Sequence, residues 1–255
     1  MLGLSIGLWS GLLRTRAPSP PASPFLMLSG EAVNFNSASD GSGSAPTTTG
    51  DAVRRWVDTS GNARHLNVLN GTPTYVEPSG NSRGSVKFDS AESLERASVG
   101  LAGAQTWALS FKLDATPTSG NFGCLMTLSD GGANTFGELW IANSGSYRPL
   151  YWRLGYTQGT AGNGVGIATT LDTTWHTLLI TYDGVSSTAA SSYTAYLDGV
   201  AQTVVASGSN SGTAGSNLKL GRNTSYTTAS QFRLVSVYAR VLTAGEIAAW
   251  HTLSA

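Results

Sequence analysis

Residues 238–247 read Tyr-Ala-Arg-Val-Leu-Thr-Ala-Gly-Glu-Ile, and this stretch joins the end of a strand to the start of a helix. Thr243, followed three residues later by Glu246, is the pattern of a capping box, in which each side chain bonds the other residue's free backbone N–H. Leu242 and Ile247 stand at the positions of a hydrophobic staple. The stretch therefore predicts a helix from this cap to the C-terminus, directly after a strand.

Short alternating strands precede this helix. Residues 107–113 alternate large apolar side chains with small or polar ones, and residues 175–182 (WHTLLITY) form the longest β run. Asp198-Gly199 lies between two strand-like runs and is typical of a type I′ hairpin, because glycine tolerates a positive φ. We expect Trp175 to face the core. Many short strands with little helical periodicity indicate an all-β sandwich or jelly roll.

Several motifs follow one another in the order found in laminin-G-like, concanavalin-A-like jelly-roll domains. Before the closing segment 238–247 they are V-D-T-S-G-N (57–62), V-K-F-D (86–89), W-H-x-x-x-x-x-Y-D-G (175–184), Y-L-D-G (196–199) and L-K-L-G (218–221). The chain from about residue 53 to about residue 252 therefore resembles this family. The resemblance implies an all-β, laminin-G-like jelly-roll sandwich. Together with the patterns at the two ends of the chain, it predicts such a sandwich with an extended N-terminal arm and one short C-terminal helix.

The first 25 residues have a different character. Apolar residues alternate with small ones in residues 2–8, which is the period of a strand, and the proline-rich residues 17–24 indicate a stiff spacer. An apolar strand held away from its own domain attracts other chains unless something covers it. We predict an assembly arm over residues 1–25, a linker or loop over residues 26–52 and the jelly-roll domain over residues 53–255. The contact residues of the arm are predicted to be Leu2, Leu4, Ile6, Leu8 and Trp9.

A cleaved or frayed leader is the alternative interpretation of this start. However, Arg14 and Arg16 follow the apolar run, whereas the positive charge of a signal peptide precedes it.

An apolar strand, a proline-rich spacer and a jelly roll in this order resemble accessory virion proteins encoded among tailed-bacteriophage structural genes. This resemblance implies a head-decoration or tail-associated protein on the virion surface, joined to other virion proteins through its arm and homo-oligomeric in the assembly.

Composition excludes several classes of function. The 255 residues carry 15 basic and 15 acidic side chains, so the chain lacks the positive charge that binding to nucleic acid needs. The apolar run of residues 1–13 is shorter than the about 20 residues that span a bilayer, so no membrane span is predicted. One cysteine and three histidines cannot assemble a Cys/His zinc cluster.

The sequence also predicts that the chain is not an enzyme. Jelly-roll glucanases present their acids in a compact E-x-D-x-x-E run, and the sequence contains none. Glu92 and Glu95 are three residues apart and would point to opposite faces of a strand. We interpret His176 as a packed or hydrogen-bonded strand histidine, and we expect His65 in a turn and His251 at a frayed end.

No cofactor is predicted, although laminin-G-like domains frequently hold a calcium ion. If one is bound, the resemblance directs attention to Asp130 and Asn134 in the glycine-containing stretch 129–134, because hard cations take oxygen ligands from loops. A simple polar turn explains the same residues equally well.

Aromatic residues on two expected strands suggest a binding surface. If Leu139 and Ile141 face the core, Trp140 faces outward; the same alternation turns Tyr151 outward. Flat aromatic faces flanked by polar groups suit sugar rings, so surface glycans are the predicted ligand in the alternative hypothesis, a carbohydrate-binding module for adhesion that is not necessarily viral. Cover by a loop or a subunit contact would explain Trp140 as well. If the two strands are neighbours, the patch consists of Trp140, Tyr151, Arg153 and Glu138.

Overall fold

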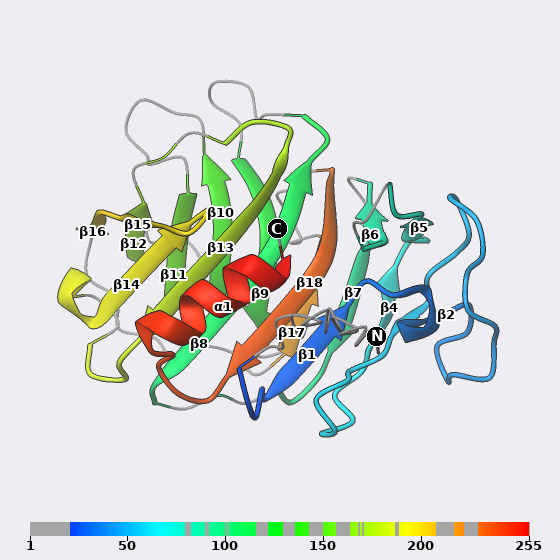
Figure 1. The fold of residues 1–255 in the computed structure, drawn as a ribbon, viewed down its shortest axis with the longest axis horizontal. Coiled ribbons are helices and arrows are strands. Elements are labelled where there is room, and N and C mark those ends of the chain that lie inside the picture. Colours follow the sequence, from blue (N-terminus) through cyan, green and yellow to red (C-terminus); the bar gives the residue numbers. More distant parts are fainter. Residues whose placement is uncertain are drawn as a thin grey trace, which may run out of the picture.

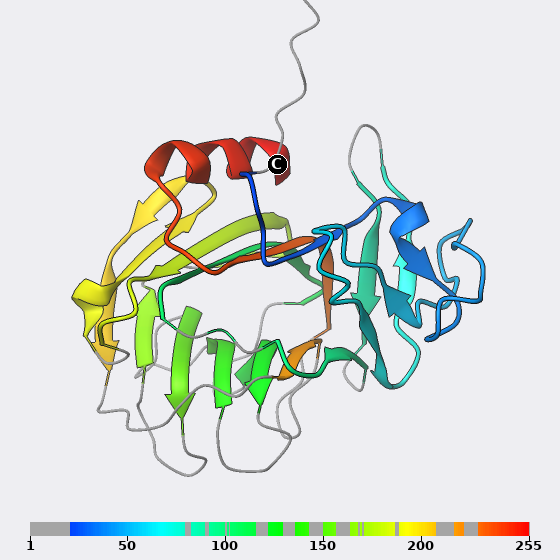
Figure 2. The same cartoon turned by 90° about the horizontal axis from the view of Figure 1, so that it is seen from below.

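The computed structural model shows two antiparallel β-sheets packed face to face, with a helix on the outer face of one sheet (Figure 1, Figure 2). This nearly all-β sandwich with one short C-terminal helix is the predicted architecture. The residues that the structure describes are 21–79, 83–89, 92–99, 101, 103–115, 122–129, 136–142, 150–156, 164–167, 169, 171–186, 189–207, 217–221 and 229–254.

The first sheet has eight strands within these ranges and carries helix α1 (Ala244–Ser254) on its outer face (Figure 2). Strand β1 (Leu26–Ser29) pairs with β18 beside the main order of the sheet. In spatial order the other strands are β15 (Val200–Gln202), β14 (Tyr193–Leu197), β13 (Trp175–Tyr182), β8 (Gln105–Leu113), β18 (Ser230–Tyr238), β6 (Ser85–Phe88) and β5 (Thr74–Val76).

The second sheet has ten strands in the part of the chain that is described. Its spatial order is β16 (Val204–Ser207), β12 (Gly164–Ile167), β11 (Leu150–Tyr156), β10 (Phe136–Ala142), β9 (Phe122–Ser129), β17 (Asn217–Leu220), β7 (Ser93–Arg96), β4 (Leu66–Asn70), β3 (Arg55–Trp56) and β2 (Phe35–Asn36). Two 3-10 turns, η1 (Ala32–Asn34) and η2 (Ala190–Ser192), precede β2 and β14.

Alternation along the strands places the core between the sheets. On β8, Trp107, Leu109 and Phe111 are buried in the core, because side chains two residues apart share one face of a strand. On β13, Leu178 and Ile180 belong to the same core. The alternation that predicted the strand over residues 107–113 therefore also identifies which side chains of β8 face the core, although Ala108 and Ser110 on its other face are buried as well.

The prediction that Trp175 faces the core is wrong. Trp175 is half-buried on the outer face of β13, where the guanidinium carbon of Arg233 lies 4.5 Å from the centre of its ring. His176 points the other way, and its ring centre is 6.0 Å from that of Phe111. Both faces of β13 are covered, since Leu179 on the outer face packs in the cluster beneath α1. Hydrophobicity alone therefore does not distinguish the two faces.

Helix α1 begins at the predicted capping box. The N–H of Thr243 donates to Glu246 Oε2 (2.9 Å), and the N–H of Glu246 donates to Thr243 Oγ1 (3.3 Å). Leu242 and Ile247, the predicted staple pair, are both buried in the cluster between α1 and β18, where Trp250 is fully buried. The local sequence thus determines where the helix starts and which side it buries.

The prediction that His251 lies at a frayed end is wrong. The helix stays regular to Ser254, and His251 Nδ1 lies 2.7 Å from Thr177 Oγ1 on β13. The end of the helix is held by the sheet below it, because the side chains of Arg233 and Ser110 both donate hydrogen bonds to the carbonyl of Ser254. A cation at the C-terminus of a helix also favours its dipole.

The capping box should make a measurable and pH-dependent contribution to stability. Thr243→Ala is expected to lower the free energy of unfolding by about 1 kcal/mol in urea melts at pH 7. The Arg240 guanidinium, followed by the Thr243 N–H, lowers the pKa of Glu246 to about 2 from an ordinary 4.5. A lowered carboxyl pKa stabilises the fold above the ordinary value and ceases to do so as the pH falls through the folded one. The difference between wild type and Glu246→Gln should therefore be largest above pH 4.5 and vanish near pH 2; a constant difference would contradict this origin.

The linker predicted over residues 26–52 is wrong at its start. Leu26 and Leu28 of β1 are fully buried where β1 pairs with β18, and the ring of Phe35 on β2 lies 5.3 Å from that of Trp56. Strands of four and two residues are too short to show an alternation. The chain from residue 37 to residue 51 contains no helix or strand and forms turns, bends and irregular segments.

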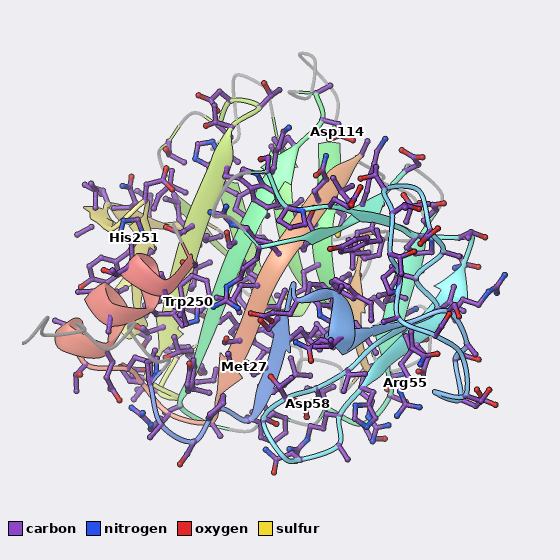
Figure 3. All side chains as sticks on the ribbon, turned by 45° about the vertical axis from the view of Figure 1, so that its right-hand side comes forward. Met27, Arg55, Asp58, Asp114, Trp250 and His251 are labelled. Carbon is purple, nitrogen blue, oxygen red and sulfur yellow. The ribbon has the colours of Figure 1, made fainter. Side chains whose placement is uncertain are left out.

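The turn at residues 58–64 binds this first strand to the rest of the sandwich (Figure 3). The buried Asp58 accepts the N–H of Met27 on Oδ1 (2.9 Å) and the N–H of Arg64 on Oδ2 (2.8 Å). The side chains of Asn62 and Arg64 donate to the carbonyl of Phe25 at 3.0 and 2.9 Å. The D-x-S-G-N motif therefore fixes the path by which residues 24–27 enter the domain.

Candidate functional site

The predicted aromatic patch lies on two strands that are direct neighbours. Strands β10 and β11 pair so that Trp140 stands opposite Tyr151 and Glu138 opposite Arg153. The side chains of these four residues lie outside what the structure describes. On the same strands Leu139 and Ile141 are buried, as expected for core-facing positions, and so are Leu150 and Trp152. The two strands are therefore neighbours, which is the condition under which Trp140, Tyr151, Arg153 and Glu138 were expected to form one patch.

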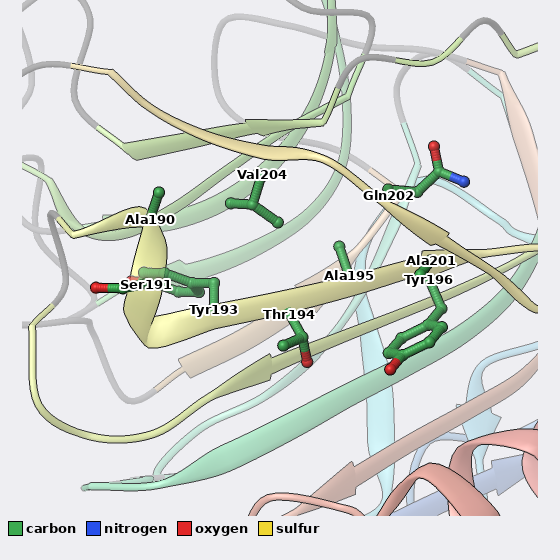
Figure 4. Close-up of a pocket in the computed structure, with 9 residues that line it drawn as sticks. All are labelled: Ala190, Ser191, Tyr193, Thr194, Ala195, Tyr196, Ala201, Gln202 and Val204. Carbon is green, nitrogen blue, oxygen red and sulfur yellow. The ribbon is translucent and has the colours of Figure 1, made fainter.

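A hollow of about 340 Å³ opens at one edge of the sandwich, where the chain crosses between the sheets (Figure 4). Strand β15 pairs with Ala195–Leu197 of β14 and stops short of Tyr193 and Thr194. The chain then leaves this sheet and continues as β16, which pairs with β12 of the other sheet. Alanines at positions 190, 195 and 201 line the gap, and their side chains are too short to fill it.

The described residues that line the hollow are uncharged. The polar ones are Ser191, Tyr193, Thr194, Tyr196 and Gln202, and the side chains of Thr194 and Tyr196 point away from Ala195 (Figure 4). Tyr193 is held by its stack on Tyr182, with ring centres 5.0 Å apart and planes inclined by 28°. Burial, with the neighbouring Tyr182 and Asp183 as lesser causes, raises the pKa of Tyr193, so its phenol stays protonated at neutral pH. The described lining of the hollow therefore combines small apolar residues with uncharged polar ones.

The buried histidine of β13 is held between two carboxylates. His176 Nδ1 lies 2.8 Å from Asp198 Oδ2, and Nε2 lies 3.2 Å from Asp172 Oδ1. Asp198 also accepts the N–H of Thr177 (2.7 Å) and has a positive φ of 51°, as its predicted type I′ hairpin requires. His176 is thus a hydrogen-bonded strand histidine, as predicted, and both of its ring nitrogens face protein carboxylates.

Asp130 and Asn134, the calcium candidates, lie outside the described ranges. Within them, the His, Cys, Asp and Glu side chains form no group of three or more that could hold a metal ion. The described helices include none that is both long and apolar enough to cross a membrane.

The comparison with protein families agrees with this architecture. Residues 80–248 match the family model of the concanavalin A-like lectin/glucanases superfamily. The chain belongs to this superfamily. The laminin-G-like, concanavalin-A-like fold predicted from the sequence is thereby confirmed. A search of curated protein sequences finds no match to the chain.

Several solved structures resemble the chain in fold at low sequence identity. Domain 4 of an extracellular arabinanase from Geobacillus stearothermophilus, in complex with arabinotriose, is 13% identical with a TM-score of 0.56, covering 76% of this chain and 91% of that one. The binding domain of botulinum neurotoxin DC in complex with SialylT is 11% identical, also with a TM-score of 0.56, covering 89% of this chain and 50% of that one. A sialidase of Trypanosoma rangeli is 14% identical with a TM-score of 0.53, covering 91% of this chain and 33% of that one. This chain therefore spans about half the length of the neurotoxin binding-domain chain and about a third of the length of the sialidase chain.

Sequence reasoning missed the hollow altogether. Its lining residues come from η2, β14, β15 and the start of β16, and of these only Tyr196 belongs to one of the motifs, Y-L-D-G (196–199). One local signal was present, namely alanines at positions 195 and 201 on both sides of the Asp198-Gly199 hairpin turn. In a lectin/glucanase sandwich such alanines are equally compatible with a closely packed edge, so the three-dimensional path was needed to reveal the gap.

Proposed function

We propose that this lectin/glucanase-type sandwich binds carbohydrate through the patch of Trp140, Tyr151, Arg153 and Glu138. The observation that carries the proposal is the register of β10 and β11, which sets Trp140 opposite Tyr151 and Glu138 opposite Arg153. Residues directly opposite on antiparallel strands have their Cβ atoms about 4.5–5.5 Å apart. Two aromatic residues and an acid–base pair therefore occupy adjacent positions on one small area of sheet.

This combination suits a sugar ring. The C–H faces of a pyranose or furanose stack on flat aromatic rings, while its hydroxyls need directed hydrogen-bond partners such as a guanidinium and a carboxylate. Support comes from two structural neighbours, one solved in complex with arabinotriose and the other in complex with SialylT. The proposed ligands are surface glycans.

Glycan-array binding of the purified full chain tests this proposal. Wild type is expected to bind a defined set of glycans, and Trp140→Ala should weaken that binding at least tenfold, because aromatic anchors dominate binding energy. Trp175→Ala is the matched control, since Trp175 lies on the outer face of the other sheet, and it should bind like wild type. Binding that survives Trp140→Ala would exclude this patch.

We further propose that the binding is not accompanied by catalysis. The E-x-D-x-x-E run of the jelly-roll glucanases is missing from the sequence, and Glu95 on β7 pairs with Lys219, its Oε1 lying 3.8 Å from the lysine Nζ. His176 is engaged by Asp198 and Asp172, as described above. The contacts of Glu95 with Lys219 and of His176 with the two aspartates are therefore consistent with structural roles for both side chains. Release of free sugar from a bound glycan during incubation with the protein would contradict this.

Finally, we propose that the sandwich is displayed on a bacteriophage particle, as a head-decoration or tail-associated protein anchored by its N-terminal arm. Support comes from the described base of the arm. Arg240 donates to the carbonyl of Ala22 (3.3 Å), and the N–H of Phe25 donates to the carbonyl of Val237 (2.6 Å). Residues 21–25 are therefore fixed on the domain, whereas Leu2, Leu4, Ile6, Leu8 and Trp9 lie outside the described residues. An anchored base suits an arm that joins other virion proteins or further copies of the chain.

A further inference from the structure

His65 stands directly after the turn at residues 58–64 and just before β4. The N–H of Asp58 donates a hydrogen bond to Nδ1 of its imidazole (3.0 Å). A ring nitrogen can accept such a bond only while it carries no proton, because both nitrogens of an imidazolium are donors. His65 therefore supports the turn in its neutral form, with the proton on Nε2.

Successive peptide groups fasten this turn on two sides. The N–H of Thr59 donates to the carbonyl of Met27 on β1 (2.8 Å), whereas the preceding N–H, that of Asp58, donates to His65. The buried carboxylate of Asp58 accepts the N–H of Met27 in turn (Figure 3). A change at His65 therefore acts on the residue that holds β1.

Protonation of His65 is incompatible with this arrangement. Nδ1 would then present a hydrogen to the N–H of Asp58, so two donors would face each other. The peptide N–H of Asp58, a residue that is only 5% exposed, would lose its acceptor, and a buried donor without a partner is costly. The turn would have to shift to relieve this contact.

We propose that His65 is a pH-sensitive latch on the first strand, which holds residues 25–27 against the turn at neutral pH and loosens them in acid. The pairing of β1 with β18 and the burial of Leu26 and Leu28 do not involve His65, so the change is a local loosening and not unfolding. Residues 25–27 connect the arm to the sandwich, so acid would increase the freedom of the arm at its base. The latch is independent of carbohydrate binding and of a virion role.

The surroundings of His65 favour its neutral form near pH 7. Burial, followed by the positive charge of Arg55 on β3, lowers the pKa of His65 from its ordinary value of 6.5. The positive charge of Arg96 on β7 acts in the same direction, and the carboxylate of Asp58 opposes it. The unfolded chain thus binds this proton more readily than the folded chain does. The contribution of His65 to stability is therefore complete above pH 6.5 and is lost as the pH falls through the lower folded pKa.

Hydrogen exchange of the full chain, followed by NMR at pH 7.5 and pH 5, tests the latch. Protection factors remove the intrinsic pH dependence of exchange and leave the structural opening. In wild type the amides of Met27, Asp58 and Thr59 should lose protection at least about fivefold at the lower pH, which is the scale of one lost hydrogen bond. Amides in the middle of β8 serve as the internal reference and should keep their protection.

Two substitutions at position 65 separate the acceptor from the charge. His65→Asn places an amide oxygen where Nδ1 stands and does not titrate in this range, so protection of the three amides should be the same at both pH values. His65→Phe offers no acceptor, so protection should be low at both. His251→Asn alters a histidine on α1 and is the matched control, which should keep the pH dependence of wild type.

The ¹⁵N chemical shift of His65 Nδ1 gives an independent readout. It should be that of an unprotonated nitrogen at pH 7.5 and should move to that of a protonated nitrogen as the pH falls. The proposal is overturned if Nδ1 carries the proton at pH 7.5, if protection of the three amides in wild type does not change with pH, or if His65→Asn shows the same loss as wild type.

Discussion

Replacing Trp107 by alanine is expected to lower the free energy of unfolding by about 3–5 kcal/mol. Trp107 is 2% exposed, and its ring centre lies 5.7 Å from that of Trp152 on the opposite sheet, so the two tryptophans form a contact across the core. The indole Nε1 also donates to the Oε1 of the buried Gln105 (2.7 Å). The substitution would leave a large cavity and an unpaired buried amide oxygen, both of which destabilise.

Trp175→Ala is the control that tests the facing of the strands. Trp175 is only half-buried, and its ring contacts the guanidinium of Arg233. A cation–π contact contributes about 0.5–2 kcal/mol, so the loss should be of that order. Denaturant melts of the two variants give the comparison. Equal losses, or a larger loss for Trp175→Ala, would mean that the faces of β8 and β13 are assigned incorrectly.

Deleting residues 1–20 is expected to leave a soluble, folded, monomeric sandwich that no longer joins its assembly. Burying Leu2, Leu4, Ile6 and Leu8 at about 1.5–3 kcal/mol each gives a gross gain of about 6–12 kcal/mol. Ordering each residue costs about 1–2 kcal/mol for the backbone. One arm alone therefore binds weakly, and several arms, or backbone pairing with the edge of another sheet, would make the attachment durable.

The structure indicates where the deletion should end. Removing residues 21–25 as well would take away Phe25, whose backbone bonds β18 and the 58–64 turn and whose ring lies 3.6 Å from the Arg64 guanidinium carbon. Deletion to residue 20 keeps these contacts, so a loss of assembly could not be attributed to a damaged domain.

Light scattering and incorporation into particles are the measurements for this deletion. A full-length chain with Leu4→Asp and Ile6→Asp is the control that keeps the length of the arm, and it should fail to assemble in the same way. If the truncated chain oligomerises and enters particles as well as the full chain, the arm hypothesis is wrong. Attachment would then have to be sought on the sandwich itself.

Much of the candidate patch followed from the sequence, because period-two alternation on β10 and β11 assigns each residue to a face. What alternation could not supply was the pairing, and the register of Trp140 with Tyr151 is a property of the folded sheet. The strand β1 shows the opposite case. Its four residues contain too little pattern to be recognised, and their partner, β18, is more than 200 residues away.

By itself the sequence determined the features whose causes are local. The capping box at Thr243 and Glu246 and the positive φ values of Asp198 and Gly199 depend on residues next to one another, so they could be read from neighbours in the chain. The order of the short motifs likewise identified the type of sandwich. Only the tertiary structure decided which face of β13 meets the other sheet, that residues 24–27 are held by the turn at Asp58, and that a hollow remains beside Ala201. Each of these three features depends on which distant segment packs against a given surface. When both faces of a strand are buried, the alternation of polar and apolar residues along it does not show which segment packs on which face.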